Sequence, residues 1–367
     1  MPMKGIPFLI VFVSGLFVFS GPVQAQPVFI PADDGRIQYL GRWDRSDPLH
    51  PRHSWPGVSI RAEFSGTRIG IRMADGDNYY NVIIDGRFHS VFHGGRPGEA
   101  DTLLADGLSD GRHTMVLSKR NISFGPIPSF SGLLVDEGAV LFQPSPLPAR
   151  RIEFIGDSFT AAEGNEATAA EMQWEAKKPV TNIDRGFAKL VAGHFSAEAH
   201  TTCRSGIGMV CDWRGDHEIA MPKFFGRTLM ESAEPGWDFS EWIPDLAVVC
   251  LGLNDHSGLH SPGGPVSEEN SALFRRTYRE FLATLRSVYP GIRILAVAAQ
   301  PDWIRRNVRQ VVDEERSAGR IDVFYAQFDD YPAGTVANGH PNVEWHGKIA
   351  GRIIAAVETI PELWNDR

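Results

Sequence analysis

A hydroxyl, a carboxamide and an imidazole occur at three points of the sequence where a serine nucleophile would need them. Ser158 follows the apolar run 152–155 in the sequence Gly-Asp-Ser, so we expect its hydroxyl at a strand end, facing a ligand crevice. Asn254 follows the apolar run 246–251, and its amide can donate to a developing oxyanion. His340 precedes a proline in a predicted loop. Because histidine titrates near neutrality, His340 suits a base that takes the serine proton and returns it to a leaving alcohol.

A further motif lies between the serine and asparagine motifs. Ser205-Gly206 places a glycine where a backbone N–H can approach the same reacting oxygen. Each motif also has an ordinary structural reading, with Ser158 as a helix cap, Asn254 in an Asx turn and Gly206 in a plain turn. His346 is a second candidate base, but it falls within a predicted helix, so we favour His340.

Residues 27–145 are predicted to be all β. Ile60, Ala62 and Phe64 alternate with polar residues, and a period of two indicates a strand with one buried face. Turn dipeptides such as Asp85-Gly86 separate several short segments of this kind, which is typical of a β-sandwich or jelly roll. The proline-rich stretch 143–148 cannot continue a strand ladder, so we place a domain boundary there.

From residue 151 onward, apolar strands alternate with segments of helical spacing. This order predicts a parallel sheet covered by helices, with its ligand crevice at the carboxyl ends of the strands. Ser158 and Asn254 both follow predicted strands and therefore belong to this crevice. Strands are expected at 152–155, 246–251, 292–298 and 321–325, and helices around 187–194, 274–285 and 343–357.

The first residues resemble an export signal. Lys4 precedes the apolar run 6–19, and small residues around Ala25 offer a cleavage site. We therefore predict a signal peptide (1–25), a β-sandwich domain (26–147) and an α/β domain (148–367). The mature protein is expected to be secreted or periplasmic, without a membrane segment. The alternative is an uncleaved membrane anchor, for which the apolar run is short.

Charge and cysteine content narrow the range of partners. A net charge of −9 over 367 residues leaves no basic excess for phosphate backbones, which argues against a nucleic-acid partner. Cys203 and Cys211 are close enough in sequence to bridge one loop, whereas Cys250 ends an apolar run and is expected to be buried. No cysteine or histidine spacing predicts a zinc site.

Trp213 and Trp303 lie in loop-like contexts and are candidate platforms for a sugar ring, with core packing as the alternative.

Taken together, the four motifs in this order resemble the SGNH, or GDSL-like, serine hydrolases. The wider context is similar to carbohydrate esterase family 2, because Tyr-Leu-Gly-Arg-Trp at 39–43, the segment 150–158 and Trp-Ile-Pro-Asp-Leu at 242–246 fit that family. The resemblance covers nearly all of the chain after residue 25. It implies an N-terminal jelly roll, a C-terminal α/β/α hydrolase domain, and removal of acetyl groups from xylan- or mannan-type polysaccharides or their oligosaccharides.

The resemblance also assigns roles to residues. Ser158 would be the nucleophile and His340 the base, and the oxyanion hole would consist of the Ser158 and Gly206 N–H groups and the Asn254 side chain. No metal or organic cofactor would be required. Two other functions fit the same fold: a carbohydrate-binding protein with a degenerate hydrolase domain, and a short-chain lipase or thioesterase, which would want a long apolar groove.

One part of the superfamily pattern is absent. The aspartate expected three residues before the histidine is Ala337 here, and an aspartate found two residues before it in a relative is Asn338. We therefore expect a Ser158–His340 dyad in which a neutral acceptor orients the imidazole, either a backbone carbonyl or the Asn338 side-chain oxygen. The alternative is a displaced acid, Asp329 or Asp330.

Overall fold

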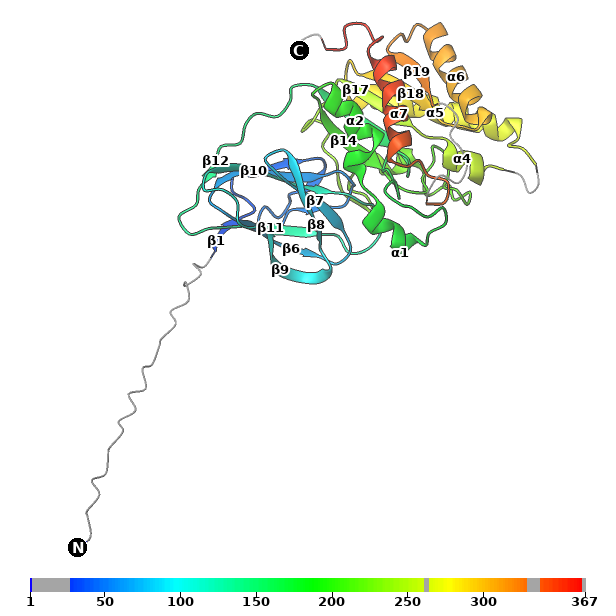
Figure 1. Cartoon of the computed structure of the whole chain (residues 1–367). Coiled ribbons are helices and arrows are strands. Elements are labelled where there is room, and N and C mark those ends of the chain that lie inside the picture. Colours follow the sequence, from blue (N-terminus) through cyan, green and yellow to red (C-terminus); the bar gives the residue numbers. More distant parts are fainter. Residues whose placement is uncertain (2–26, 261–263, 329–336, 365–367) are drawn as a thin grey trace.

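The computed structural model describes residue 1 and residues 27–260, 264–328 and 337–364. The predicted signal peptide therefore lies outside the described residues, apart from Met1. Figure 1 shows two parts side by side: an N-terminal region built of strands and a C-terminal region in which helices cover a sheet. Strand β12 of the first part ends at Phe142 and strand β13 of the second begins at Arg151, with no helix or strand between them.

The N-terminal region consists of two antiparallel sheets that share one core. Side chains from both sheets, including Phe64 and Met115 from one and Ile71 and Phe130 from the other, belong to a single buried cluster. The predicted inward residues Ile60, Ala62 and Phe64 are all buried. One sheet has the order β3 (Trp43–Asp44), β4 (Arg52–His53), β11 (Ser129–Val135), β6 (Ile69–Asp75), β9 (Arg96–Ala105), with β1 (Val28–Pro31) on β11. The other has the order β12 (Leu141–Phe142), β5 (Ser59–Ser65), β10 (Arg112–Lys119), β7 (Tyr79–Ile84), β8 (Arg87–His93), with β2 (Gln38–Leu40) on β5.

The C-terminal region is built on a five-stranded parallel sheet. Its order is β14 (Glu198–Cys203), β13 (Arg151–Gly156), β17 (Leu246–Cys250), β18 (Arg293–Ala298), β19 (Val323–Gln327). The first strand in sequence, β13, therefore lies between the second and the third. Such an arrangement opens a crevice where the chain leaves β13 and β17. The fold class predicted from the sequence is confirmed.

Helices cover both faces of this sheet. Phe154, Val248 and Leu295 pack with helices α2 (Phe187–His194) and α7 (Val343–Val357), while neighbouring strand residues such as Val249 and Ala296 pack with α5 (Glu268–Val288) and α6 (Asp302–Ser317). The remaining short elements are α1 (Trp174–Lys177), η1 (Lys178–Val180), η2 (Ile183–Arg185), α3 (Met221–Phe224), α4 (Leu253–Gly258), and the hairpin β15 (Arg227–Leu229) and β16 (Ser232–Gly236). Within the described ranges, no helix has both the length and the apolar character needed to cross a bilayer.

A buried ion pair joins the two regions. Arg42, from the loop between β2 and β3, donates to Glu153 on β13 over 2.8 Å, and both side chains are almost fully buried. The guanidinium also donates to the backbone carbonyls of Phe225 and Arg227. Thr202 on β14 donates to the same Glu153 oxygen over 2.6 Å. Removing one partner of such a pair leaves an uncompensated charge in the interior.

We therefore expect Arg42→Met to lower the free energy of unfolding by about 3–5 kcal/mol, because Glu153 would remain buried without its partner. The matched control is Arg72→Met, which breaks the half-exposed pair with Asp101 and should cost less than about 1 kcal/mol. Chemical denaturation measures both, and the double variant Arg42→Met/Glu153→Gln should recover part of the loss. Equal losses for Arg42→Met and Arg72→Met would contradict this account.

Candidate active site

Ser158 and His340 lie within hydrogen-bond distance at the carboxyl edge of the parallel sheet. Ser158 follows β13 directly, and His340 lies in the loop that leads into α7. The Nε2 atom of His340 is 2.9 Å from the Ser158 hydroxyl oxygen, and its Nδ1 atom is 2.8 Å from the carbonyl oxygen of Ala337. A carbonyl can only accept, so Nδ1 carries the proton and Nε2 is left to accept from the serine.

Among the described residues, the acceptor for the Nδ1 proton of His340 is the backbone carbonyl of Ala337. The Asn338 side chain is engaged elsewhere: its Nδ2 donates to Glu171, and its oxygen accepts from the Met172 N–H. Asp329 and Asp330, the two alternatives, lie outside the described residues. Ala337 has a positive φ of 43° and is buried against Gly164, where any Cβ would overlap the alanine side chain. A glycine at 164 is therefore needed for the histidine loop to dock beside Ser158.

Two predicted oxyanion donors have no hydrogen-bond acceptor among the residues that the structure describes. Among the hydrogen bonds of the described residues, no acceptor takes the backbone N–H of Ser158 or that of Gly206. Gly206 lies in the loop after β14 with a φ of 80°, a conformation that suits glycine. Both N–H groups are thus available to a ligand oxygen.

Asn254 lies in the first turn of α4, directly after β17. One N–H of its amide is fixed by the Ile207 carbonyl at 2.8 Å, and Nδ2 lies 3.4 Å from a carboxylate oxygen of Asp157. The amide is therefore held in the same corner as the Ser158 and Gly206 loops. Its second N–H, which makes only the longer contact, is the one that a ligand oxygen can compete for.

Two buried carboxyl groups, those of Asp255 and Asp157, contact the residues of this corner. Asp255 accepts backbone N–H groups from Met209 at 2.7 Å and Val210 at 2.6 Å, which fixes the loop that carries Gly206. Burial raises the pKa of Asp255 to about 6 despite these donors. Burial also raises the pKa of Asp157 to about 7, and the charges of Asp255 and Glu163 act in the same direction.

Glu163 is a site residue that sequence reasoning missed. Its backbone N–H donates to the Ser158 carbonyl at 3.0 Å, so it follows the serine in the same loop. Its buried carboxylate accepts from Lys177 and from the Ser205 hydroxyl, and one oxygen lies 4.0 Å from His340 Nε2. Burial would raise the pKa of Glu163, but a protonated His340, the Lys177 charge and the hydrogen bonds from Lys177 and Ser205 together outweigh burial and lower it. The only sequence signal was an acidic residue in a run of small and apolar ones.

The two candidate tryptophans have different surroundings. Trp213 is 56% exposed, and its backbone N–H donates to the Gly206 carbonyl at 3.2 Å. Its ring stands beside the predicted oxyanion loop, because a Cβ at Gly206 would lie 3.1 Å from the ring Cδ1. Trp303 does not lie in a loop: it is in the first turn of α6 and buried, with its ring N–H donating to Ser271. The core-packing alternative therefore describes Trp303, because helix α6 turns this side chain inward against Phe274.

The other titratable candidates are structural. His346 is fully buried in α7, accepts the Phe187 N–H at 3.2 Å, and has a pKa that burial lowers to about 3. Cys203, Cys211 and Cys250 are free and buried, so the possible bridge between the first two is not formed. Over the part of the chain that the structure describes, no group of three or more His, Cys, Asp or Glu side chains is arranged to hold a metal ion.

Comparisons with known proteins point to one family. Residues 39–145 match the family model described as "Carbohydrate esterase 2 N-terminal". "Cellulase/esterase CelE" from Acetivibrio thermocellus is 30% identical over 336 residues, which are 89% of this chain and 40% of that protein. This chain therefore spans less than half the length of CelE.

Two further relatives match over most of their length. "Acetylxylan esterase / glucomannan deacetylase" from Cellvibrio japonicus is 26% identical over 344 residues, 90% of each protein. The solved structure of a family two carbohydrate esterase from Clostridium thermocellum in complex with cellohexaose superposes with a TM-score of 0.79 at 28% identity. It covers 88% of this chain and 98% of that one.

The buried Asp157 carboxyl predicts a pH dependence of stability. Its pKa of about 7 in the folded protein exceeds the ordinary value of 3.8, so the folded state keeps a proton that the unfolded chain releases. The stabilisation is complete below pH ~4 and is lost as the pH rises to ~7. Relative to wild type, Asp157→Asn should therefore gain stability across this range, by an amount on the order of a few kcal/mol.

Denaturant unfolding at intervals between pH 4 and pH 8 measures this difference. The exposed Asp110→Asn is the control and should follow the wild-type curve at every pH. A constant offset between wild type and Asp157→Asn would mean that Asp157 does not titrate in this range.

Proposed function

The chain belongs to carbohydrate esterase family 2, and on that premise we propose that it is an exported serine esterase. Its substrates are O-acetyl groups on plant cell-wall polysaccharides, or their oligosaccharides, of the xylan or mannan type. The observation that carries the proposal is the 2.9 Å hydrogen bond between Ser158 and His340. The names of the relatives, acetylxylan esterase and glucomannan deacetylase, support the substrate class. The N-terminal pattern around Lys4 supports export.

The reaction proceeds in two halves. The Ser158 oxygen attacks the acetyl carbonyl while His340 Nε2 takes the hydroxyl proton, and the carbonyl electrons move onto the oxygen. When the tetrahedral intermediate collapses, the bond to the sugar oxygen breaks and His340 returns the proton to that oxygen. In the second half, His340 deprotonates a water that attacks the acetyl-serine. Acetate leaves, and Ser158 recovers its proton.

Three donors stabilise the oxyanion in both halves. The Ser158 and Gly206 N–H groups have no acceptor among the described residues, so they need not give up a partner to bind it. The second N–H of Asn254 makes only a long contact of 3.4 Å with Asp157. Donors fixed in place before the reaction contribute most to catalysis, roughly 3–4 kcal/mol each. The exposed ring of Trp213 beside Gly206 offers a face for the sugar.

The Ala337 carbonyl that accepts from His340 Nδ1 carries no negative charge. In a triad the acid fixes the tautomer and also stabilises the imidazolium that forms. The Ala337 carbonyl performs the first task only. We propose that Glu163, whose carboxylate lies 4.0 Å from Nε2, performs part of the second. Opposite charges at this separation attract one another, and Lys177, which donates to the same carboxylate, reduces the net effect.

Ser158→Ala and His340→Ala should each lower kcat for acetate release from acetylated xylan and glucomannan by a factor on the order of 10⁴ or more. Neither side chain contributes much to the core, so the melting temperature should remain within a few degrees of wild type. Asp329→Ala and Asp330→Ala are the controls for the dyad and should lose far less. A loss near 10⁴-fold in either aspartate variant would replace the dyad with a displaced triad.

Glu163→Gln tests the counter-charge, because glutamine keeps the shape and can still accept from Ser205. We expect kcat to fall about 10- to 100-fold. The acid limb of the pH profile of kcat/KM should move to lower pH, since the imidazolium loses a neighbouring negative charge. Lys177→Met should move the limb the opposite way by leaving Glu163 without its counter-charge.

The control is Glu315→Gln, which removes a buried, ion-paired carboxylate on α6. It should leave the pH profile unchanged. If Glu163→Gln lowers kcat without shifting the acid limb, Glu163 acts only as a structural support for Ser205.

A further inference from the structure

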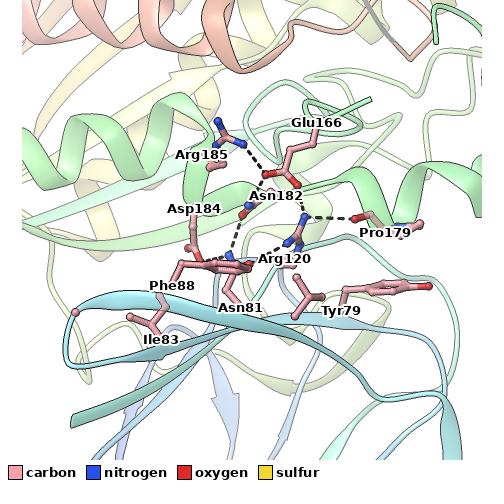
Figure 2. Close-up of a pocket in the computed structure, with 12 residues that line it drawn as sticks. Tyr79, Asn81, Ile83, Phe88, Arg120, Glu166, Pro179, Asn182, Asp184 and Arg185 are labelled. Carbon is pink, nitrogen blue, oxygen red and sulfur yellow. Dashed lines mark hydrogen bonds and ion pairs between the residues drawn. The ribbon is translucent and has the colours of Figure 1, made fainter. Parts of the chain in front are cut away.

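A cavity of about 680 Å³ lies at the border between the two regions, away from the predicted catalytic groups. One side is the outer face of strands β7 and β8, and the other is the segment from Glu166 to Arg185 of the hydrolase domain. Figure 2 shows Phe88, Ile83 and Tyr79 on the strand side, with Glu166, Asn182 and Arg185 above them. The volume falls within the range of small-molecule sites, which often form at domain borders.

The polar part of this cavity is already held in place. Arg120 is buried and donates to Glu166 and, at 3.0 Å, to the Asn81 side chain. Asn81 in turn donates to Asn182 at 2.9 Å and to Asp184 at 2.7 Å. These groups form the dashed network in Figure 2. A ligand would therefore meet polar groups whose positions are fixed before it binds, which lowers the ordering cost of binding.

The strand side supplies apolar surface. Phe88 is 63% exposed and Val91 is 42% exposed, and both line this cavity, where they form an exposed apolar patch. Tyr79 also lines the cavity, and its ring stacks on that of His93 with 4.1 Å between the ring centroids, which restricts its orientation. Ile83 on β7 lies opposite Phe88 on β8. The cavity thus combines aromatic faces with a fixed set of hydrogen-bonding groups.

The charges of the cavity identify the class of occupant. Arg120 and Arg185 are balanced by Glu166 and Asp184, so the lining carries no net charge and gives no advantage to an ion. A neutral pyranose has apolar C–H faces that match an aromatic ring and hydroxyls that match fixed polar groups. A lipid tail would displace water from these polar groups without replacing its hydrogen bonds, at a cost.

We infer that this cavity is an accessory saccharide site, which holds a neutral, unacetylated stretch of the polysaccharide while another stretch occupies the active site. The inference rests on the proposed function for its substrate class. The location supports it, because the loop that begins at Ser158 runs through Glu163 to Glu166, which lines the cavity. One protein segment, 158–166, therefore joins the nucleophile to the lining of the cavity.

Phe88→Ala tests the site, with Phe29→Ala as the matched control: Phe29 is a 38% exposed phenylalanine on β1, in the other sheet of the sandwich. We expect Phe88→Ala to raise KM for acetylated xylan about tenfold, with kcat for p-nitrophenyl acetate as the reference for an intact active site. Phe29→Ala should match wild type on both substrates. Equal KM values for the two variants on the polymer would overturn the inference.

Hydrogen–deuterium exchange provides a second measurement that does not depend on catalysis. Unacetylated xylohexaose should slow exchange over residues 79–93 in wild type and in Ser158→Ala, but not in Phe88→Ala. Absence of protection in wild type, or protection by an oligogalacturonate and not by xylohexaose, would overturn the inference. If wild type hydrolyses neither ester, the proposed function fails on its own, and the exchange result still reports on saccharide binding.

Discussion

The hydrogen bond between Ser158 and His340 joins residues 182 positions apart in the chain, and much of the C-terminal region serves to hold it. Bringing such distant residues together has an entropic cost that the rest of the fold must offset. The parallel sheet does so by placing the end of β13 beside the loop before α7, with α7 and α2 packed on the same face of the sheet. The fit of Ala337 against Gly164 then fixes the carbonyl that orients the imidazole.

The N-terminal sandwich also contributes to this geometry. The loop that begins at Ser158 continues to residue 186, and side chains of the sandwich hold it at several points. Arg120 binds Glu166, Asn81 binds Asn182, and Asp77 pairs with Lys178 at 2.7 Å. Lys178 pairs with the sandwich, and its neighbour Lys177 donates to Glu163, whose carboxylate lies near His340. The sandwich is therefore connected to the His340 site through one short helical segment. The buried Arg42–Glu153 ion pair is a further contact between the N-terminal and C-terminal regions.

Buried charge determines how this site can work. Asp157 and Asp255 are fully buried beneath the crevice, and burial raises the pKa of both, whereas Lys177, Ser205 and a protonated His340 together lower the pKa of Glu163 against its burial. The three nearby carboxyl groups therefore differ in pKa because their surroundings differ. Glu163, the one whose pKa is lowered, has an oxygen 4.0 Å from His340 Nε2, where a negative charge favours the proton transfer.

The sequence by itself determined the fold class and brought forward Ser158, Gly206, Asn254 and His340, because the period of buried residues follows from the local backbone and because the motifs are contiguous in the chain. It also favoured a neutral acceptor for His340, with Asp329 or Asp330 as the alternative. Only the tertiary structure showed that the Ala337 carbonyl, and not the Asn338 side chain, accepts from His340. It also showed that Trp303 is buried and Trp213 exposed. The same holds for Cys203 and Cys211, which are free in the structure. Only the tertiary structure revealed Glu163, since its partners Lys177, Ser205 and His340 come from three separate segments. Residue type and spacing predict the secondary structure and the motifs of a local segment. These outcomes depend instead on contacts between distant segments, which a local pattern does not specify.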